Sequence, residues 1–128
     1  LGASPMAVIL FEILLNATAT FNHGNIRIPM HVDRALRLFV VTPDMHRVHH
    51  SILPGEMNSN FGFSLPWWDH LFGTYRAQPE GGHEGMTIGI NAFREPTDQR
   101  LDNMLMQPLK GGALGYAIND RRKPNPDK

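Results

Sequence analysis

Residues 42–51 read TPDMHRVHHS, and this stretch decides how the rest of the chain is interpreted. The tripeptide Thr42-Pro43-Asp44 is typical of a helix start, with an N-cap, a proline at the first helical position and an acid in the first turn. Pro54-Gly55 follows soon afterwards and stops a helix. We therefore predict a short, well-capped helix that carries the histidines.

His46, His49 and His50 stand at positions i, i+3 and i+4 of this helix. These positions project from one face, so the three imidazoles are neighbours. Neutral imidazole is a good ligand for iron, zinc, copper and nickel, and the cluster therefore predicts a metal site. The alternative is a solvated helix face that is rich in histidine.

The composition excludes several classes of site. The 128 residues contain no cysteine, so disulfides, iron–sulfur clusters and thiolate-ligated haem are excluded. Twelve basic and twelve acidic side chains leave no net charge, and nothing indicates a nucleic-acid partner. A metal here must be held by histidine together with carboxylate, amide or water ligands.

Residues 1–21 are mostly apolar and predict a membrane-embedded helix, with a buried helix of a soluble protein as the alternative. Arginines follow at positions 27, 34, 37 and 47. An excess of basic groups beside a membrane segment indicates the cytoplasmic side, although an ordinary solvated surface gives the same pattern. Residues 32–41 have helical spacing, and we expect an amphipathic helix that packs its apolar face on a core.

The remaining histidines differ in context. His23 ends the apolar segment, where it either turns towards a metal or caps the helix C-terminus. His31, His70 and His83 lack ligand spacing, and we expect none of them to bind metal. Asp69 lies among aromatic residues, where a carboxylate needs a partner and the N–H of a ligating imidazole is one candidate.

The C-terminal part is predicted to be rich in loops. Residues 86–93 are expected to be extended and residues 98–107 helical. Residues 110–128 are rich in glycine, proline and charge and are expected to form a flexible polar tail. The fold class expected for the chain is all-α.

Four motifs occur in an order that resembles a known family. They are FNHGN at residues 21–25, TPDMHRVHHS at residues 42–51, NFG at residues 60–62 and WDHLFGTY at residues 68–75. Together they resemble the fatty acid hydroxylase superfamily, and within it the bacterial sterol desaturase-like proteins. The resemblance runs over residues 1–109.

The resemblance implies an integral membrane enzyme with a His-rich, non-haem diiron centre. Such enzymes use O₂ and an electron donor to hydroxylate or desaturate fatty acids, sterols or alkylglycerols. It also implies that His23, His46, His49 and His50 are metal ligands, with Asn25 and Asp69 as candidates for their outer partners. The parent protein would be multi-pass, with its metal site facing the cytoplasm.

The chain departs from the family pattern in what it lacks. Family members carry an earlier His-x(3–4)-His motif and another His-x-x-His-His, and neither occurs in this sequence. The resemblance is therefore to the C-terminal half of such an enzyme, which we expect to be inactive alone. The alternatives are a non-catalytic metal-binding membrane fragment and a zinc hydrolase, in which zinc replaces iron.

Overall fold

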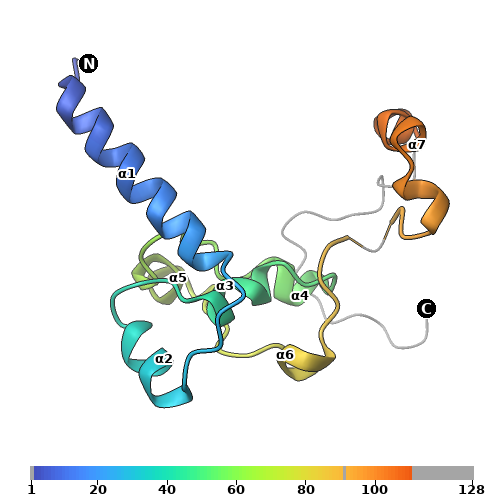
Figure 1. The fold of residues 1–128 in the computed structure, drawn as a ribbon. Coiled ribbons are helices and arrows are strands. Elements are labelled where there is room, and N and C mark those ends of the chain that lie inside the picture. The colour runs from blue at the N-terminus through green and yellow to red at the C-terminus, as the bar shows by residue number, and fades with distance from the viewer. Residues whose placement is uncertain (1, 91, 111–128) are drawn as a thin grey trace.

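The computed structural model describes residues 2–90 and 92–110, and a long first helix rises from a small body of short helices and loops (Figure 1). The helices of the body are α2 (Met30–Leu36), α3 (Pro43–His49), α4 (Pro54–Met57), α5 (Trp67–Phe72) and α6 (Gly82–Gly85). Within the described residues no strand forms, and the one β-bridge pairs Ser51 with Ile88. The predicted helical class is therefore confirmed for this part of the chain.

Helix α1 (Pro5–Asn22) begins where its sequence provides a cap. The Ser4 side chain accepts a hydrogen bond from the backbone N–H of Ala7, and Pro5 occupies the first helical position. Eighteen residues span about 27 Å, close to the thickness of a bilayer core. Only 6% of the helix is buried, and its length and composition suffice to cross a membrane. The predicted helix is thus present, at residues 5–22 rather than 1–21.

Helix α2 corrects the expectation for residues 32–41. The helix ends at Leu36, and the side chains that it buries are Asp33 and Arg37 rather than the apolar ones. The two form an ion pair at 2.6 Å, and Arg37 also donates to the carbonyl of Ala77 at 2.7 Å. Phe39 is left 67% exposed. The periodicity correctly indicated a helix. The face that it buries, however, is the one that carries the Asp33–Arg37 ion pair and not the apolar one.

Polar side chains make up most of the interior. The fully buried large hydrophobic residues are Val41, Met45 and Val48. Beside them Asn60 donates to the carbonyls of Met45 and Arg76, at 2.8 and 2.9 Å, and accepts from the backbone N–H of Arg76 at 2.8 Å. One amide therefore ties α3 to the segment that follows α5.

Asp69 of α5 organises the loop on either side of that helix. Its carboxylate accepts hydrogen bonds from the backbone N–H groups of Phe61 and Gly62, at 2.7 and 2.8 Å, and from the hydroxyl of Thr74 at 2.6 Å. The side chain is 1% exposed. A buried carboxylate is stable only when its acceptor capacity is used, and here three donors use it.

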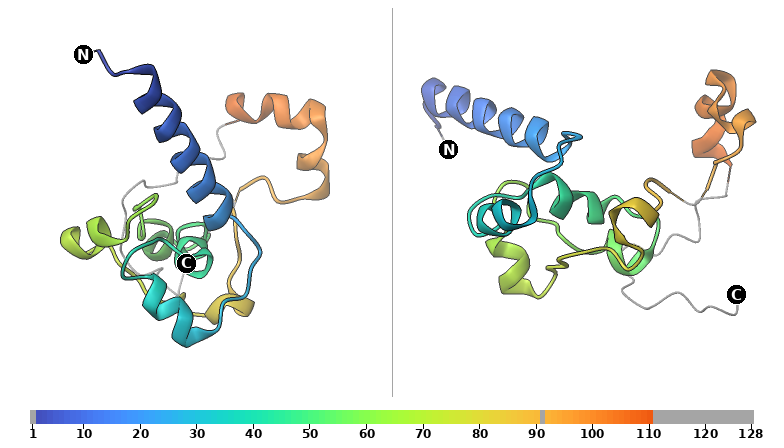
Figure 2. Two further views of the ribbon diagram at one scale, coloured as in Figure 1. Left: turned by 60° about the vertical axis from the view of Figure 1, so that its left-hand side comes forward. Right: turned by 60° about the horizontal axis from the view of Figure 1, so that its bottom comes forward.

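The C-terminal part of the described chain lies apart from the body. Residues 86–90 pass alongside residues 50–52 through the Ser51–Ile88 bridge and a hydrogen bond from Gly89 to the carbonyl of His50 at 2.8 Å. The helical turns η1 (Pro96–Gln99), α7 (Leu101–Met106) and η2 (Gln107–Leu109) then form a separate arm (Figure 2). This confirms helix within residues 98–107. Of the tail predicted at residues 110–128, all but Lys110 lies outside the described residues.

Replacing Asp69 should destabilise the body. An Asp69→Ala change leaves two backbone donors and one hydroxyl without their charged acceptor, and we expect a loss of about 3 kcal/mol in the free energy of unfolding. Thermal unfolding in detergent measures it. Asp102→Ala is the matched control, because that carboxylate pairs with Arg100 on the exposed surface. Equal melting temperatures for the two variants would contradict the role given to Asp69.

A second structural test concerns Gly62. A Cβ atom at this position would lie 2.6 Å from the carbonyl oxygen of Leu65 and 2.7 Å from Oδ2 of Asp69. Gly62→Ala should therefore cost about 2 kcal/mol through overpacking. At Gly85 a Cβ meets nothing within 4 Å, so Gly85→Ala should leave the unfolding temperature nearly unchanged. Comparison of the two unfolding curves tests the packing around Gly62. An unchanged unfolding temperature for Gly62→Ala would show that the space between Gly62, Leu65 and Asp69 is wider than these distances imply.

Candidate metal centre

Helix α3 presents the histidine cluster in the predicted way. The Thr42 hydroxyl accepts from the backbone N–H of Met45 at 3.4 Å, and Pro43 occupies the first turn. The helix ends at His49, so His50 is its C-cap. Met45 and Val48 are fully buried on one side of α3, which fixes its rotation and turns the histidines to the other side.

His23 reaches the cluster from the end of α1. Its Nδ1 lies 2.9 Å from the carbonyl of Ala19, so that nitrogen carries the proton and Nε2 keeps a free lone pair. The Nε2 atom lies 3.2 Å from Nε2 of His46, which in turn lies 3.1 Å from Nε2 of His50. Three ring nitrogens from two helices therefore converge, and all lie within 4.8 Å of one another. Of the two alternatives for His23, the structure combines both: the residue is the C-cap of α1, with Nδ1 on a carbonyl of its last turn, and its Nε2 faces the cluster.

Two of the separations between these nitrogens fit a shared metal ion. Imidazole nitrogens bind first-row metals at about 2.0–2.1 Å, so neighbouring ligands lie about 2.9 Å apart at right angles and about 3.4 Å apart in a tetrahedron. The contacts at 3.1 and 3.2 Å fall between these limits. His46 could thus share a metal ion with either neighbour as the rings stand. The three nitrogens lie within 4.8 Å of one another, whereas two opposite ligands of one ion are at most about 4.2 Å apart, so His23 or His50 would move slightly for all three to bind one ion.

His49 stands beside this triad rather than in it. Its Nδ1 lies 3.0 Å from the carbonyl of Ser59, and its ring centre is 5.7 Å from that of His46 and 5.5 Å from that of His50. A histidine whose Nδ1–H is held by a carbonyl offers Nε2 as its ligand atom. His49 therefore keeps its Nε2 available, although this nitrogen is not one of the three that converge.

Burial favours the neutral form of two rings of the cluster. It lowers the pKa of His46 to about 4, helped by the neighbouring His50, His23 and His49. Burial, His49 and His23 lower the pKa of His50 as well. At neutral pH these rings therefore carry free lone pairs, which a metal ligand requires. The Nδ1 atom of His46 is buried without a hydrogen-bond partner among the described residues, an arrangement that costs stability.

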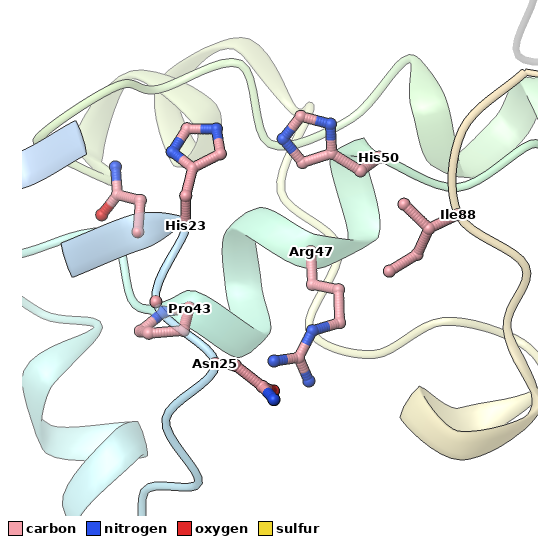
Figure 3. A pocket seen from close by; sticks show the side chains of 8 residues that line it. His23, Asn25, Pro43, Arg47, His50 and Ile88 are labelled. Atoms are coloured by element: carbon pink, nitrogen blue, oxygen red, sulfur yellow. The ribbon is translucent and has the colours of Figure 1, made fainter. Parts of the chain in front are cut away.

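A pocket of about 360 Å³ opens next to two of the ligands (Figure 3). His23 and His50 face each other on one side of it, while Asn25 and the guanidinium of Arg47 lie on the other. Pro43 and Ile88 supply apolar wall. Arg47 forms an ion pair with Asp44 at 2.9 Å, so its charge is balanced. The pocket can take a small part of a ligand beside the histidine triad.

The two candidates for outer partners differ in position. Asn25 lines the pocket beside His23. Asp69 accepts hydrogen bonds from Phe61, Gly62 and Thr74, and no imidazole is among its partners. The outer partners that the structure does provide are the backbone carbonyls of Ala19 and Ser59. Sequence reasoning missed them because every residue has a carbonyl and no residue type marks the ones that are used.

The other three histidines lie outside the cluster. His31 is exposed on α2, and His70 stacks on Tyr75 with ring centres 4.1 Å apart. His83 of α6 lies at a second pocket, beside Arg27 and Glu84, and burial lowers its pKa. Both of its ring nitrogens are buried without a partner among the described residues.

Comparison with known proteins identifies the relatives of the chain. An alkylglycerol monooxygenase of Xenopus tropicalis is 37% identical over 65 residues, which are 51% of this chain and 14% of that protein. The human alkylglycerol monooxygenase is 40% identical over 58 residues, 45% of this chain and 13% of that protein. An ornithine lipid hydroxylase of Rhizobium tropici is 46% identical over 44 residues, 34% of this chain and 13% of that protein.

The match therefore covers about a seventh of the length of each curated relative. No solved structure shows significant similarity to the chain. A family model described as fatty acid hydroxylase matches residues 1–74, the segment that contains α1 and every histidine of the cluster. The chain belongs to the fatty acid hydroxylase family.

Proposed function

We propose that this chain forms part of a membrane-bound, O₂-dependent lipid hydroxylase or desaturase with a non-haem diiron centre. The observation that carries the proposal is the convergence of the Nε2 atoms of His23, His46 and His50. The relatives support the lipid substrate, since their names describe oxidation of an alkylglycerol and of an ornithine lipid.

The chain's own residues would hold and orient the metal. His23, His46 and His50 would bind it, and His49 would bind the same ion or its neighbour through Nε2. The carbonyls of Ala19 and Ser59 fix the ring tautomers of His23 and His49, so that the lone pairs already point correctly before metal arrives. Iron bound there would supply the activation of O₂ that oxidation of an unreactive C–H bond requires.

The pocket beside the metal would hold the part of the lipid that reacts. Its volume of about 360 Å³ accommodates a short stretch of chain rather than a whole lipid. Pro43 and Ile88 exclude water from one side, and Arg47 and Asn25 offer hydrogen bonds to a polar group of the substrate. A lipid that leaves the bilayer along α1 meets His23 where this helix ends, which explains why a membrane helix leads into the site.

Four histidines cannot satisfy two metal ions. A diiron site needs roughly eight or more nitrogen and oxygen donors, so the remaining ligands would come from further parts of the parent protein. On this proposal the 128 residues provide half of the centre and are inactive alone.

Loss of one ligand should remove both metal and activity. In the parent protein at its native length, we expect His46→Ala to lower turnover more than about 100-fold, beyond the effect of losing an outer partner. Iron content should fall with it, measured by elemental analysis of the purified protein. His49→Ala should have a similar effect if His49 is a ligand. His31→Ala is the control, because this exposed ring touches nothing at the centre.

The same experiment separates the alternatives. Stoichiometric iron with O₂-dependent turnover supports the proposal, and normal iron and turnover in His46→Ala would overturn the ligand assignment. A protein that holds zinc and hydrolyses lipid without O₂ would be a zinc hydrolase instead. Metal binding with no turnover in the native-length parent would identify a non-catalytic metal-binding protein.

We further propose that α1 crosses the bilayer with His23 at its cytoplasmic end, in a multi-pass parent. The chain has no cysteine, so Ala3→Cys and Arg34→Cys in a cysteine-free parent report one site each. Both positions are exposed. In intact cells an impermeant thiol reagent should label Ala3→Cys, and it should reach Arg34→Cys only after permeabilisation. Labelling of Arg34→Cys from outside would reverse the orientation.

A further inference from the structure

The body carries an apolar surface that nothing in the described chain covers. Six large side chains on it are between 54% and 70% exposed. We call this surface the aromatic face, and it consists of Leu38, Phe39, Trp67, Trp68, Leu71 and Phe72. Contiguous apolar surface of this kind on a folded protein marks an interaction site.

The aromatic face is a built surface rather than a set of loose side chains. The indole N–H of Trp67 donates to the carbonyl of Leu38 at 2.6 Å and joins α5 to the segment after α2. On the inner side of α5, the buried Asp69 carboxylate is held by its three donors, so the outer side is fixed in direction. Because Trp67 has its partner within the protein, its ring can enter an apolar medium without an unpaired donor.

The segment that leads into α5 is attached to the last turns of α1. The Asn22 amide donates to the carbonyl of Phe63, and the hydroxyls of Thr18 and Ser64 lie 3.0 Å apart. The Ser64 carbonyl also accepts from the backbone N–H of Val41 at 3.0 Å, which brings in the segment that follows Phe39. Both parts of the aromatic face are therefore tied to the level at which α1 ends.

The arrangement of the helices supports the same placement. Helix α5 extends sideways near the C-terminal end of α1, while α6, with the exposed Arg27–Glu84 ion pair, lies on the side of the body away from the free part of α1 (Figures 1 and 2). Apolar aromatic groups thus lie near the end of the apolar helix, and a solvated charge pair lies far from it.

We propose that the aromatic face inserts into the interfacial layer of the same bilayer that α1 crosses, so that the body lies on the membrane surface. This inference rests on the proposed membrane placement of α1. The lipid interface is the occupant that fits, because the face lies near the level at which an apolar helix ends (Figures 1 and 2), and because tryptophan is enriched at membrane interfaces.

Nitroxide labels in lipid vesicles test the depth of the face. Single cysteines replace Leu71 on the aromatic face, Phe11 in the middle of α1 and, as control, Glu84 on α6, in the cysteine-free native-length parent. All three side chains are exposed, so the substitutions do not disturb packing. The accessibility of each label to O₂, which concentrates in lipid, is compared with its accessibility to a water-soluble nickel chelate.

We expect Phe11→Cys to be accessible to O₂ and closed to the chelate, and Glu84→Cys to be open to the chelate. Leu71→Cys should lie between them, with several-fold less chelate access than Glu84→Cys and raised O₂ access. A Leu71 label as open to chelate as the Glu84 label would overturn the inference, and so would one shielded from both reagents, which would indicate a protein partner or a second copy. Access of the nickel chelate to the label at Phe11 would show that α1 does not cross the bilayer, and the inference drawn from that placement would fail with it.

Discussion

The fold depends on hydrogen bonds from buried polar side chains more than on an apolar core. The three fully buried aliphatic or thioether side chains of the described residues, worth about 2 kcal/mol each, cannot order loops of this length. The loops are instead fixed by side chains such as Asp69 and Asn60, which bind backbone groups from distant segments. Leaving any of these groups unpaired is expensive, so a single loop conformation satisfies them all.

This network positions the metal centre directly. Asn60 donates to the carbonyl of Met45, the residue before His46, and so holds α3 against the loop. Ser59, the residue before Asn60, provides the carbonyl that orients the His49 ring. The loop geometry that Asn60 and Asp69 enforce is therefore the geometry that sets the ligand rings. Asn60 binds no histidine itself, but it holds the backbone of the residue before His46, and so it influences the position of that ring.

The sequence predicted the parts of the site that follow from local chemistry. The cap at Thr42 and the spacing of the histidines depend on neighbouring residues only. The cap is confirmed, and of the three helix histidines the structure brings His46 and His50 together and leaves His49 beside them. His23 could not be assigned from spacing, since its approach to His46 depends on how α1 meets α3. An imidazole was one candidate partner for Asp69, but its partners are two backbone N–H groups and the Thr74 hydroxyl, and no side-chain pattern reveals the backbone groups. On α2 the apolar pattern suggested the wrong buried face because Asp33 finds Arg37 within its own helix.

The distribution of polarity is the reverse of that in a water-soluble domain, where charged groups are outside and large apolar groups within. Here Asp33, Arg37, Glu56 and Asp69 are buried, while α1, the aromatic face and α7 expose large apolar side chains. Such a chain gains little by collapsing on itself, because its apolar groups remain outside after it folds. Its stability therefore depends on what surrounds it, which on the proposed placement is lipid together with the rest of the parent protein. The same surroundings would limit water near the histidines, and neutral imidazoles with their lone pairs directed at one point are what such an environment favours.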